Sequence, residues 1–121
     1  MRKKILVVDD AETIVMMEQM ILGKKYDVVA ARDGSEAVST AIAEKPDLIL
    51  MDMMMPIVGG IEACQRLRAT AETKDIPIIM VTTRSEVANV EAGYASGCSD
   101  YVTKPINGLE LMTKVRSFIG E

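Results

Sequence analysis

The segment LILMDMMMPIVGG, Leu48 to Gly60, decides the fold of this chain. It begins as an unbroken apolar run, which is typical of a strand buried on both faces of a sheet, and the run ends abruptly at Asp52. A proline and two glycines, Pro56, Gly59 and Gly60, then separate it from a helical pattern. Other predicted strands also end in polar residues, and the arrangement of these residues explains why Asp52 stands at the end of this strand.

Short apolar runs alternate with helical patterns along the chain, and we find no repeat, low-complexity segment or linker. Strands are predicted at Lys4–Asp9, Tyr26–Ala31, Asp47–Asp52, Ile76–Thr82 and Asp100–Thr103. Helices are predicted where Ile14, Met17, Ile21 and Leu22 share one face, and over Ser35–Glu44, Ile61–Arg68, Ser85–Ala95 and Asn107–Ile119. Five strand–helix units in 121 residues predict a single α/β domain over residues 1–121, with parallel strands and crossover helices.

The composition excludes several classes of function. A formal net charge of −4 argues against a nucleic-acid-binding surface, which needs clustered Lys and Arg. The chain has no histidine, which excludes His metal sites and Ser–His or Cys–His pairs within it. Cys64 and Cys98 lack metal-site spacing and are expected to be reduced core residues. No apolar run approaches the ~18 residues of a membrane span, so we expect a cytoplasmic protein.

Polar residues stand at the ends of four of the five predicted strands. These are Asp9 and Asp10, then Asp52, Thr82 and Lys104. Each alone has an ordinary interpretation as a helix cap, a turn residue or a surface residue. In an open parallel sheet, however, ligands bind beyond the carboxyl ends of the strands, and these ends share one edge. Three crowded carboxylates repel one another, and a divalent cation relieves the repulsion. Oxygen ligands favour Mg²⁺, with Mn²⁺ as a substitute.

The same residues suit phosphoryl transfer. Mg²⁺ and the Lys104 ammonium would neutralise phosphoryl oxygens, while Thr82 would donate a hydrogen bond to them. Because no His is available to activate a hydroxyl or thiol, the nucleophile is expected to be a carboxylate that forms an aspartyl phosphate. Asp52 stands apart from the Asp9–Asp10 pair and is therefore the best candidate for the acceptor.

Four motifs in this chain resemble the receiver domain of bacterial two-component response regulators. They are VVDD (Val7–Asp10), DMMMPIVGG (Asp52–Gly60), VTT (Val81–Thr83) and YVTKP (Tyr101–Pro105), in the family's order and spacing. The resemblance covers essentially the whole chain. It implies a flavodoxin-like (βα)5 fold, a doubly wound parallel sheet with strand order 2-1-3-4-5. It also implies a phosphorylation-activated signalling switch that catalyses only its own phosphorylation and dephosphorylation.

The resemblance implies roles for the acidic residues. Asp52 would be the phosphoacceptor. Asp10 and Asp52 would ligate Mg²⁺ together with the Met54 backbone carbonyl, and Asp9 would act mostly through water. The phosphoryl group would come from a histidine kinase or phosphotransfer protein, or from a small donor such as acetyl phosphate.

The resemblance also implies a switch and an output surface. Lys104 would contact the phosphoryl group, Thr82 would be the switch hydroxyl and Tyr101 the switch aromatic. The peptide bond before Pro105 is expected to be cis. The fourth helix, fifth strand and fifth helix would contact an unidentified downstream protein or output domain, with no contact to nucleic acid or membrane. Whether the native protein is stand-alone or longer stays open.

Three other functions fit the sequence less well. A phosphatase of the haloacid-dehalogenase type needs a second Asp two residues after the nucleophile, where this chain has Met54. A flavin- or nucleotide-binding module needs a Gly- or hydroxyl-rich loop after the first strand, where this chain has Asp9 and Asp10. A receiver that signals without phosphorylation is the third alternative, and the presence of every expected site residue argues against it.

Overall fold

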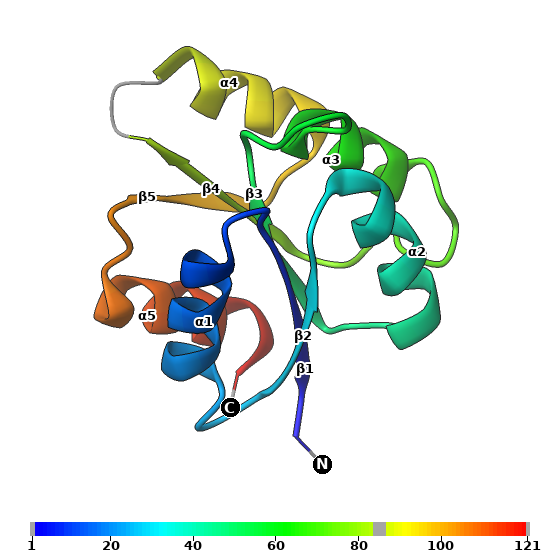
Figure 1. Ribbon diagram of the computed structural model, residues 1–121. Helices are drawn as coiled ribbons and strands as arrows, with labels where there is room; N and C mark the ends of the chain where they lie inside the picture. The colour runs from blue at the N-terminus through cyan, green and yellow to red at the C-terminus, as the bar shows by residue number, and fades with distance from the viewer. Residues whose placement is uncertain (1, 84–86, 121) are drawn as a thin grey trace.

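The computed structural model describes residues 2–83 and 87–120, in which five strands alternate with five helices (Figure 1). The strands are β1 (Lys4–Val8), β2 (Asp27–Ala31), β3 (Leu48–Asp52), β4 (Ile78–Thr83) and β5 (Asp100–Lys104). The helices are α1 (Glu12–Leu22), α2 (Gly34–Glu44), α3 (Gly60–Arg68), α4 (Val87–Ser96) and α5 (Gly108–Ile119). Where the sequence predicted bounds, they agree within one or two residues, but the predicted start of the fourth helix at Ser85 lies outside the described residues.

The strands form one parallel sheet in the order β2-β1-β3-β4-β5, which confirms the predicted topology. Helices α1 and α5 cover one face, and α2, α3 and α4 cover the other (Figure 1). β3 lies in the middle, with Met51 beside Val8 of β1 and Asp52 beside Val81 of β4. The residues that follow β1 and β4 therefore lie on either side of Asp52.

Side chains of β3 alternate between two apolar layers. Leu48 and Leu50 pack with the layer under α1 and α5, whereas Ile49 and Met51 pack with the layer under α2 and α3. All residues of β3 are buried, because both faces of the sheet are covered. This explains the unbroken apolar run before Asp52.

Helix α1 differs from its prediction in the face that it buries. Met17 was expected on the buried face but is 40% exposed. The buried residues are Val15, Glu18 and Leu22, so the helix is rotated relative to the predicted face. A glutamate thus occupies the middle of an apolar stripe.

Two further observations agree with the composition. Cys64 and Cys98 are free and buried, as predicted. Within the described ranges, no helix combines the length and the apolar character that crossing a membrane requires.

Candidate functional site

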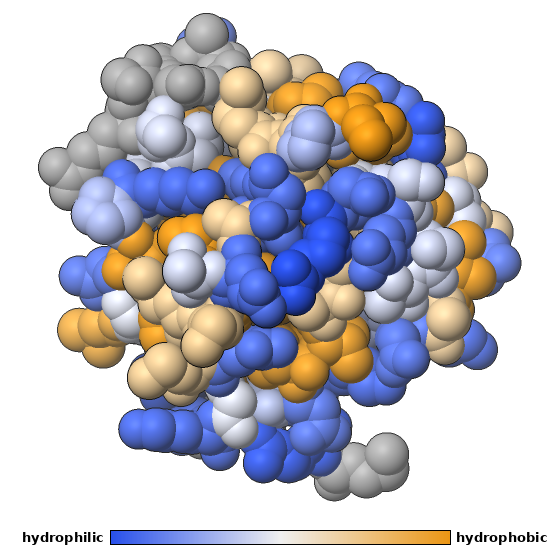
Figure 2. All heavy atoms as spheres, viewed as in Figure 1, coloured by the Kyte–Doolittle hydropathy of each residue, from blue (hydrophilic) through white to orange (hydrophobic). Residues whose placement is uncertain are grey.

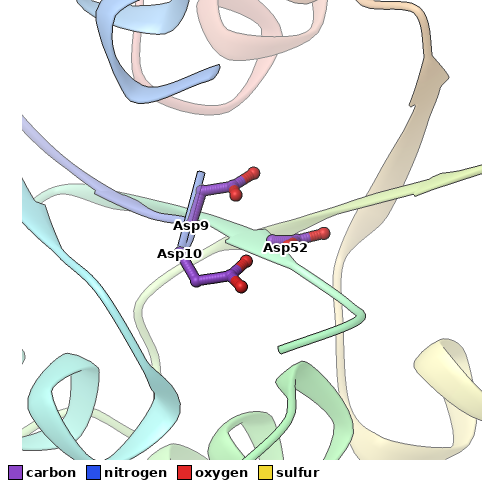
Figure 3. A group of neighbouring side chains, drawn as sticks. All are labelled: Asp9, Asp10 and Asp52. Carbon is purple, nitrogen blue, oxygen red and sulfur yellow. The ribbon is translucent and has the colours of Figure 1, made fainter. Parts of the chain in front are cut away.

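Three carboxylates gather at the carboxyl ends of β1 and β3. Figure 3 shows Asp9, Asp10 and Asp52 directing their carboxylates into the same space. Each offers one oxygen to a group whose atoms all lie within 4.8 Å of one another. Asp9 and Asp52 are buried and Asp10 is exposed, so the group opens to solvent on one side. Figure 2 shows hydrophilic residues gathered in the middle of this face of the molecule.

Local hydrogen bonds set the position of Asp9. Its backbone N–H donates to the Ala31 carbonyl oxygen of β2 at 3.2 Å. Its Oδ1 accepts from the Ala11 N–H at 2.8 Å, which bends the chain from β1 into α1. Its Oδ2 is buried and has no hydrogen-bond partner among the described residues. The Lys104 ammonium lies 3.7 Å from this oxygen, beyond hydrogen-bond distance, so a bound cation or ligand would satisfy an oxygen that is otherwise buried without a hydrogen bond from any described residue.

Lys104, at the end of β5, brings a positive charge to these carboxylates. Its Nζ lies 3.2 Å from Asp52 Oδ1 and 3.7 Å from Asp9 Oδ2. Burial alone lowers the pKa of Lys104, but Asp52 and Asp9 outweigh this effect and raise the pKa overall. The peptide bond between Lys104 and Pro105 is cis, as predicted.

Asp52 is held at the centre of the site. Its Oδ1 accepts hydrogen bonds from Lys104 Nζ at 3.2 Å and from the Met54 N–H at 3.5 Å. The pKa of Asp52 is raised to about 6, chiefly by burial and also by the charge of Asp9, while Lys104 opposes the rise. The carboxylate is therefore mostly ionised at neutral pH and available as a nucleophile.

Gly60 allows α3 to begin directly against the end of β3. A Cβ at this position would lie 2.4 Å from the Asp52 carbonyl oxygen and 2.8 Å from Met53 Cα. The Gly60 N–H donates to the Met53 carbonyl oxygen at 3.0 Å, which closes the loop after the strand. A side chain at residue 60 would therefore push on the backbone that carries Asp52.

Thr82 and Tyr101 come from neighbouring strands. Thr82 is buried at the end of β4, and its Oγ1 has no hydrogen-bond partner within the described ranges. Tyr101 is partly buried on β5 and packs edge-to-face on Tyr94, with ring centroids 6.1 Å apart. Lys114 Nζ lies 4.9 Å from the centroid of the Tyr101 ring. The structure thus leaves a buried hydroxyl free to donate near Asp52, and an aromatic residue on the adjacent strand.

Sequence reasoning missed Glu18. Its side chain is 1% exposed, and its Oε1 has no hydrogen-bond partner in the described part of the chain. The pKa of Glu18 is raised to about 8, chiefly by burial and also by the charges of Asp9 and Asp52, while Lys104 opposes the rise. The available signal was its spacing, three residues after Val15 and four before Leu22 on one helix face.

The donor set fits a hard divalent cation. A group of carboxylate oxygens that is open to solvent on one side suits Mg²⁺. A bound cation would also account for Asp9 Oδ2, which is buried without a hydrogen bond in the described part of the chain. The acidic triad of Asp9, Asp10 and Asp52 is therefore consistent with a magnesium site. Met54 is 64% exposed, and the role expected for its backbone carbonyl stays a prediction.

Comparison with known proteins settles the family. A family model described as the response regulator receiver domain matches residues 5–116. This chain is a member of that family. It is 43% identical over 120 residues to the alkaline phosphatase synthesis transcriptional regulatory protein PhoP of Bacillus subtilis, covering 98% of this chain and 49% of that protein. The chain spans about half the length of the curated relatives it matches.

Solved structures agree with this assignment. The chemotaxis protein CheY4 of Vibrio cholerae superposes with a TM-score of 0.92 at 31% identity, covering 98% of this chain and 100% of that one. The receiver domain of the sensor histidine kinase PA1611 from Pseudomonas aeruginosa PAO1 superposes with a TM-score of 0.91 at 30% identity and covers 100% of both chains. That structure has a magnesium ion coordinated in its active site cleft.

Family membership establishes the general function. The chain is a receiver domain, a phosphorylation-activated switch of two-component systems. It is a signalling phosphoacceptor rather than a true enzyme, and its family implies a histidine kinase as partner.

Proposed function

We propose that Asp52 is the phosphoacceptor, with a histidine kinase, a phosphotransfer protein or acetyl phosphate as the donor. One observation carries the assignment: of the three clustered carboxylates, Asp52 is the one hydrogen-bonded to the Lys104 ammonium, at 3.2 Å. Asp9 uses Oδ1 to hold the turn to Ala11, and Asp10 is exposed. Asp52 therefore combines restricted access with a cation that would stabilise the incoming phosphoryl oxygens.

The transfer makes one bond and breaks one bond. A carboxylate oxygen of Asp52 attacks phosphorus, and the bond from phosphorus to the donor breaks, with its electron pair leaving on the donor group. Asp10, Asp52 and the Met54 backbone carbonyl would hold Mg²⁺, with Asp9 acting mostly through water. When bound, the ion supplies positive charge to the phosphoryl oxygens. Lys104 neutralises a further part of their charge.

Thr82 and Tyr101 would convert the modification into a change of surface. The buried Thr82 hydroxyl lacks a partner and would donate a hydrogen bond to a phosphoryl oxygen on Asp52. Movement of Thr82 vacates space, which Tyr101 would enter. Tyr101 contacts Tyr94 of α4 and Lys114 of α5, so its movement would alter the face formed by α4, β5 and α5.

This face would bind a downstream protein or an output domain. We assign residues 1–121 to one receiver domain that contacts neither membrane nor nucleic acid, the latter being disfavoured by a net charge of −4. The free Cys64 and Cys98 fit the cytoplasmic location proposed for the protein.

Intact-mass spectrometry tests the acceptor assignment. Mg²⁺ with acetyl phosphate is expected to add one phosphoryl group to the parent protein and none to Asp52→Asn. Asp75→Asn, which changes an exposed carboxylate outside the site, is the matched control and is expected to be modified like the parent. Modification of Asp52→Asn as efficient as that of the parent would show that the acceptor is another residue.

Hydrogen exchange tests the switch. With a beryllofluoride mimic of the phosphoryl group, amide protection is expected to change over residues 87–106. Thr82→Ala is expected to weaken this response while leaving Asp52 open to modification. Changes confined to α1 or α2 would place the switch surface elsewhere.

A further inference from the structure

Strand β5 lies at the edge of the sheet, between two helices on opposite faces. The strand order β2-β1-β3-β4-β5 places it there. Figure 1 shows α4 on one side of the sheet and α5 on the other side. Side chains from both helices reach around this edge, and they meet at Asp100 and Tyr101, the first two residues of β5.

Lys114 of α5 makes three contacts at this edge. Its Nζ lies 3.2 Å from Asp100 Oδ1, and the two side chains are each 27% exposed. The ammonium also donates a hydrogen bond to the Tyr101 carbonyl oxygen and lies over the Tyr101 ring, 4.9 Å from the ring centroid. A cation at this distance from a ring face is attracted to it. One ammonium thus contacts both the backbone and the ring of Tyr101.

Asp100 extends this network to α4. Its Oδ1 accepts hydrogen bonds from the Tyr94 hydroxyl at 3.3 Å and from the Tyr101 N–H at 2.7 Å. The rings of Tyr94 and Tyr101 pack edge-to-face, with an angle of 88° between their planes. We call Tyr94, Asp100 and Lys114 the edge clasp. Its members together contact the N–H, the carbonyl oxygen and the ring of Tyr101.

Tyr101 lies on the same face of the sheet as Thr82. The register of β4 and β5 places Tyr101 opposite Met80, two residues before Thr82. Met80 and Tyr101 both pack with the apolar layer under α2 and α3. Because alternate residues of a strand point to the same face, Thr82 points to that face too. The Tyr101 ring and the Thr82 hydroxyl are therefore diagonal neighbours on adjacent strands.

We propose that Lys114 and Asp100 are positioning residues for the switch aromatic, Tyr101. The edge clasp holds the Tyr101 ring against α4 in the unphosphorylated protein, and its strength sets how readily the ring moves toward Thr82. Every contact that the ring loses on moving favours the resting position. A partly exposed ion pair adds little to overall stability, so the main effect of the pair falls on the switch. This inference rests on the proposed roles of Thr82 and Tyr101.

The affinity for beryllofluoride measures the strength of the edge clasp. The mimic is titrated with excess Mg²⁺ and followed by fluorine NMR. It binds the switched state preferentially, so a weaker resting state raises the apparent affinity. Lys114→Met is expected to tighten binding about three- to tenfold, and Asp100→Ala is expected to act in the same direction. Because the two variants remove opposite charges, a purely electrostatic effect on the anionic mimic would have opposite signs.

Further variants show whether the edge clasp acts through the ring. In a Tyr101→Ala background, Lys114→Met is expected to have no effect on the affinity. Lys114→Arg keeps the charge and a group that stacks on aromatic rings, so it is expected to behave like the parent. The matched control is Lys4→Met, which breaks a partly exposed ion pair with Glu44 at 2.8 Å, outside the edge clasp. It is expected to leave the affinity unchanged.

The Tyr101 ring gives a second measurement, made without the mimic. The chain has three tyrosines, so ring-labelled tyrosine gives few NMR signals, and Tyr101→Phe assigns one of them. In Lys114→Met, the Tyr101 signal is expected to shift toward its position in the mimic-bound parent. A change in packing alone would not move the signal along that line.

Three results would overturn the proposal. Unchanged or weaker binding in Lys114→Met would mean that the edge clasp does not restrain the switch. Equal tightening in the Tyr101→Ala background would mean that Lys114 acts on another group. Opposite shifts for Lys114→Met and Asp100→Ala would mean that charge alone acts. Urea denaturation checks the fold of each variant, and Lys114→Gln repeats the test with a polar replacement.

Failure of the proposed switch is recognised separately. If Tyr101 takes no part in the switch, Tyr101→Ala alone keeps the parent's change in amide protection over residues 87–106 when the mimic binds. If only the edge clasp is wrong, Tyr101→Ala weakens that change while Lys114→Met leaves the affinity for the mimic as in the parent.

Discussion

Replacing Glu18 by Gln is expected to change how the stability of the metal-free protein depends on pH. The folded-state pKa of Glu18 is about 8, above its ordinary value of 4.5. Between these values the folded protein keeps a proton that the unfolded chain has released. The contribution of the protonated Glu18 to the free energy of unfolding is therefore fully present below pH 4.5 and is lost as the pH rises toward 8.

The magnitude follows from this window. Each pH unit within it changes the free energy of unfolding by about 1.4 kcal/mol, so Glu18 costs the parent about 3 kcal/mol between pH 5 and pH 7. Gln has a similar shape and cannot ionise. The difference in stability between Glu18→Gln and the parent is therefore expected to grow by about 3 kcal/mol over this range, or on the order of 10 °C in Tm.

Urea denaturation at pH 5, 6 and 7 with a chelator measures this difference. Other titrating groups are common to both proteins, so their contributions largely cancel in the comparison. Glu12→Gln, at an exposed position on the same helix, is expected to differ from the parent by a constant amount. A difference between Glu18→Gln and the parent that stays constant from pH 5 to pH 7 would refute the reasoning, because Glu18 would then ionise normally in the folded protein.

Three further substitutions test the backbone and the metal site. Gly60→Ala would place a Cβ 2.4 Å from the Asp52 carbonyl oxygen and is expected to lower the free energy of unfolding, measured with urea, by about 2 kcal/mol or more. The control is Gly59→Ala, whose Cβ would lie 3.4 Å from the Met53 carbonyl oxygen and which is expected to be nearly neutral. Ile57 has a φ of 68° and is 94% exposed, so Ile57→Asn is expected to stabilise the protein by about 1 kcal/mol, and a lower urea midpoint would contradict this. Asp10→Asn is expected to weaken Mg²⁺ binding about tenfold or more and to raise the stability of the metal-free protein, since it removes one of three crowded carboxylates, and an unchanged affinity would argue against the site.

Much of the site could be predicted because it is built from strand ends. Asp9, Asp52, Thr82 and Lys104 each follow or end an apolar run that is visible in the sequence. Once the alternation of strands and helices indicates a parallel sheet, all carboxyl ends must lie at one edge. Predicting the convergence of these residues therefore needed only local patterns and one rule of topology, and the carboxylates of Asp9, Asp10 and Asp52 do lie together, with one oxygen of each within 4.8 Å of the others.

The sequence by itself determined the order of the elements, the doubly buried β3 and the residue types at the strand ends, since these depend on neighbours close along the chain. Only the tertiary structure decided that Glu18 is buried while Met17 is 40% exposed. Periodicity predicts that a helix has an apolar face, but the rotation of α1 depends on its packing against the sheet and α5. The raised pKa values of Asp52 and Glu18 were likewise hidden, because burial and charges from β1, β3 and β5, distant in sequence, produce them only when the chain is folded.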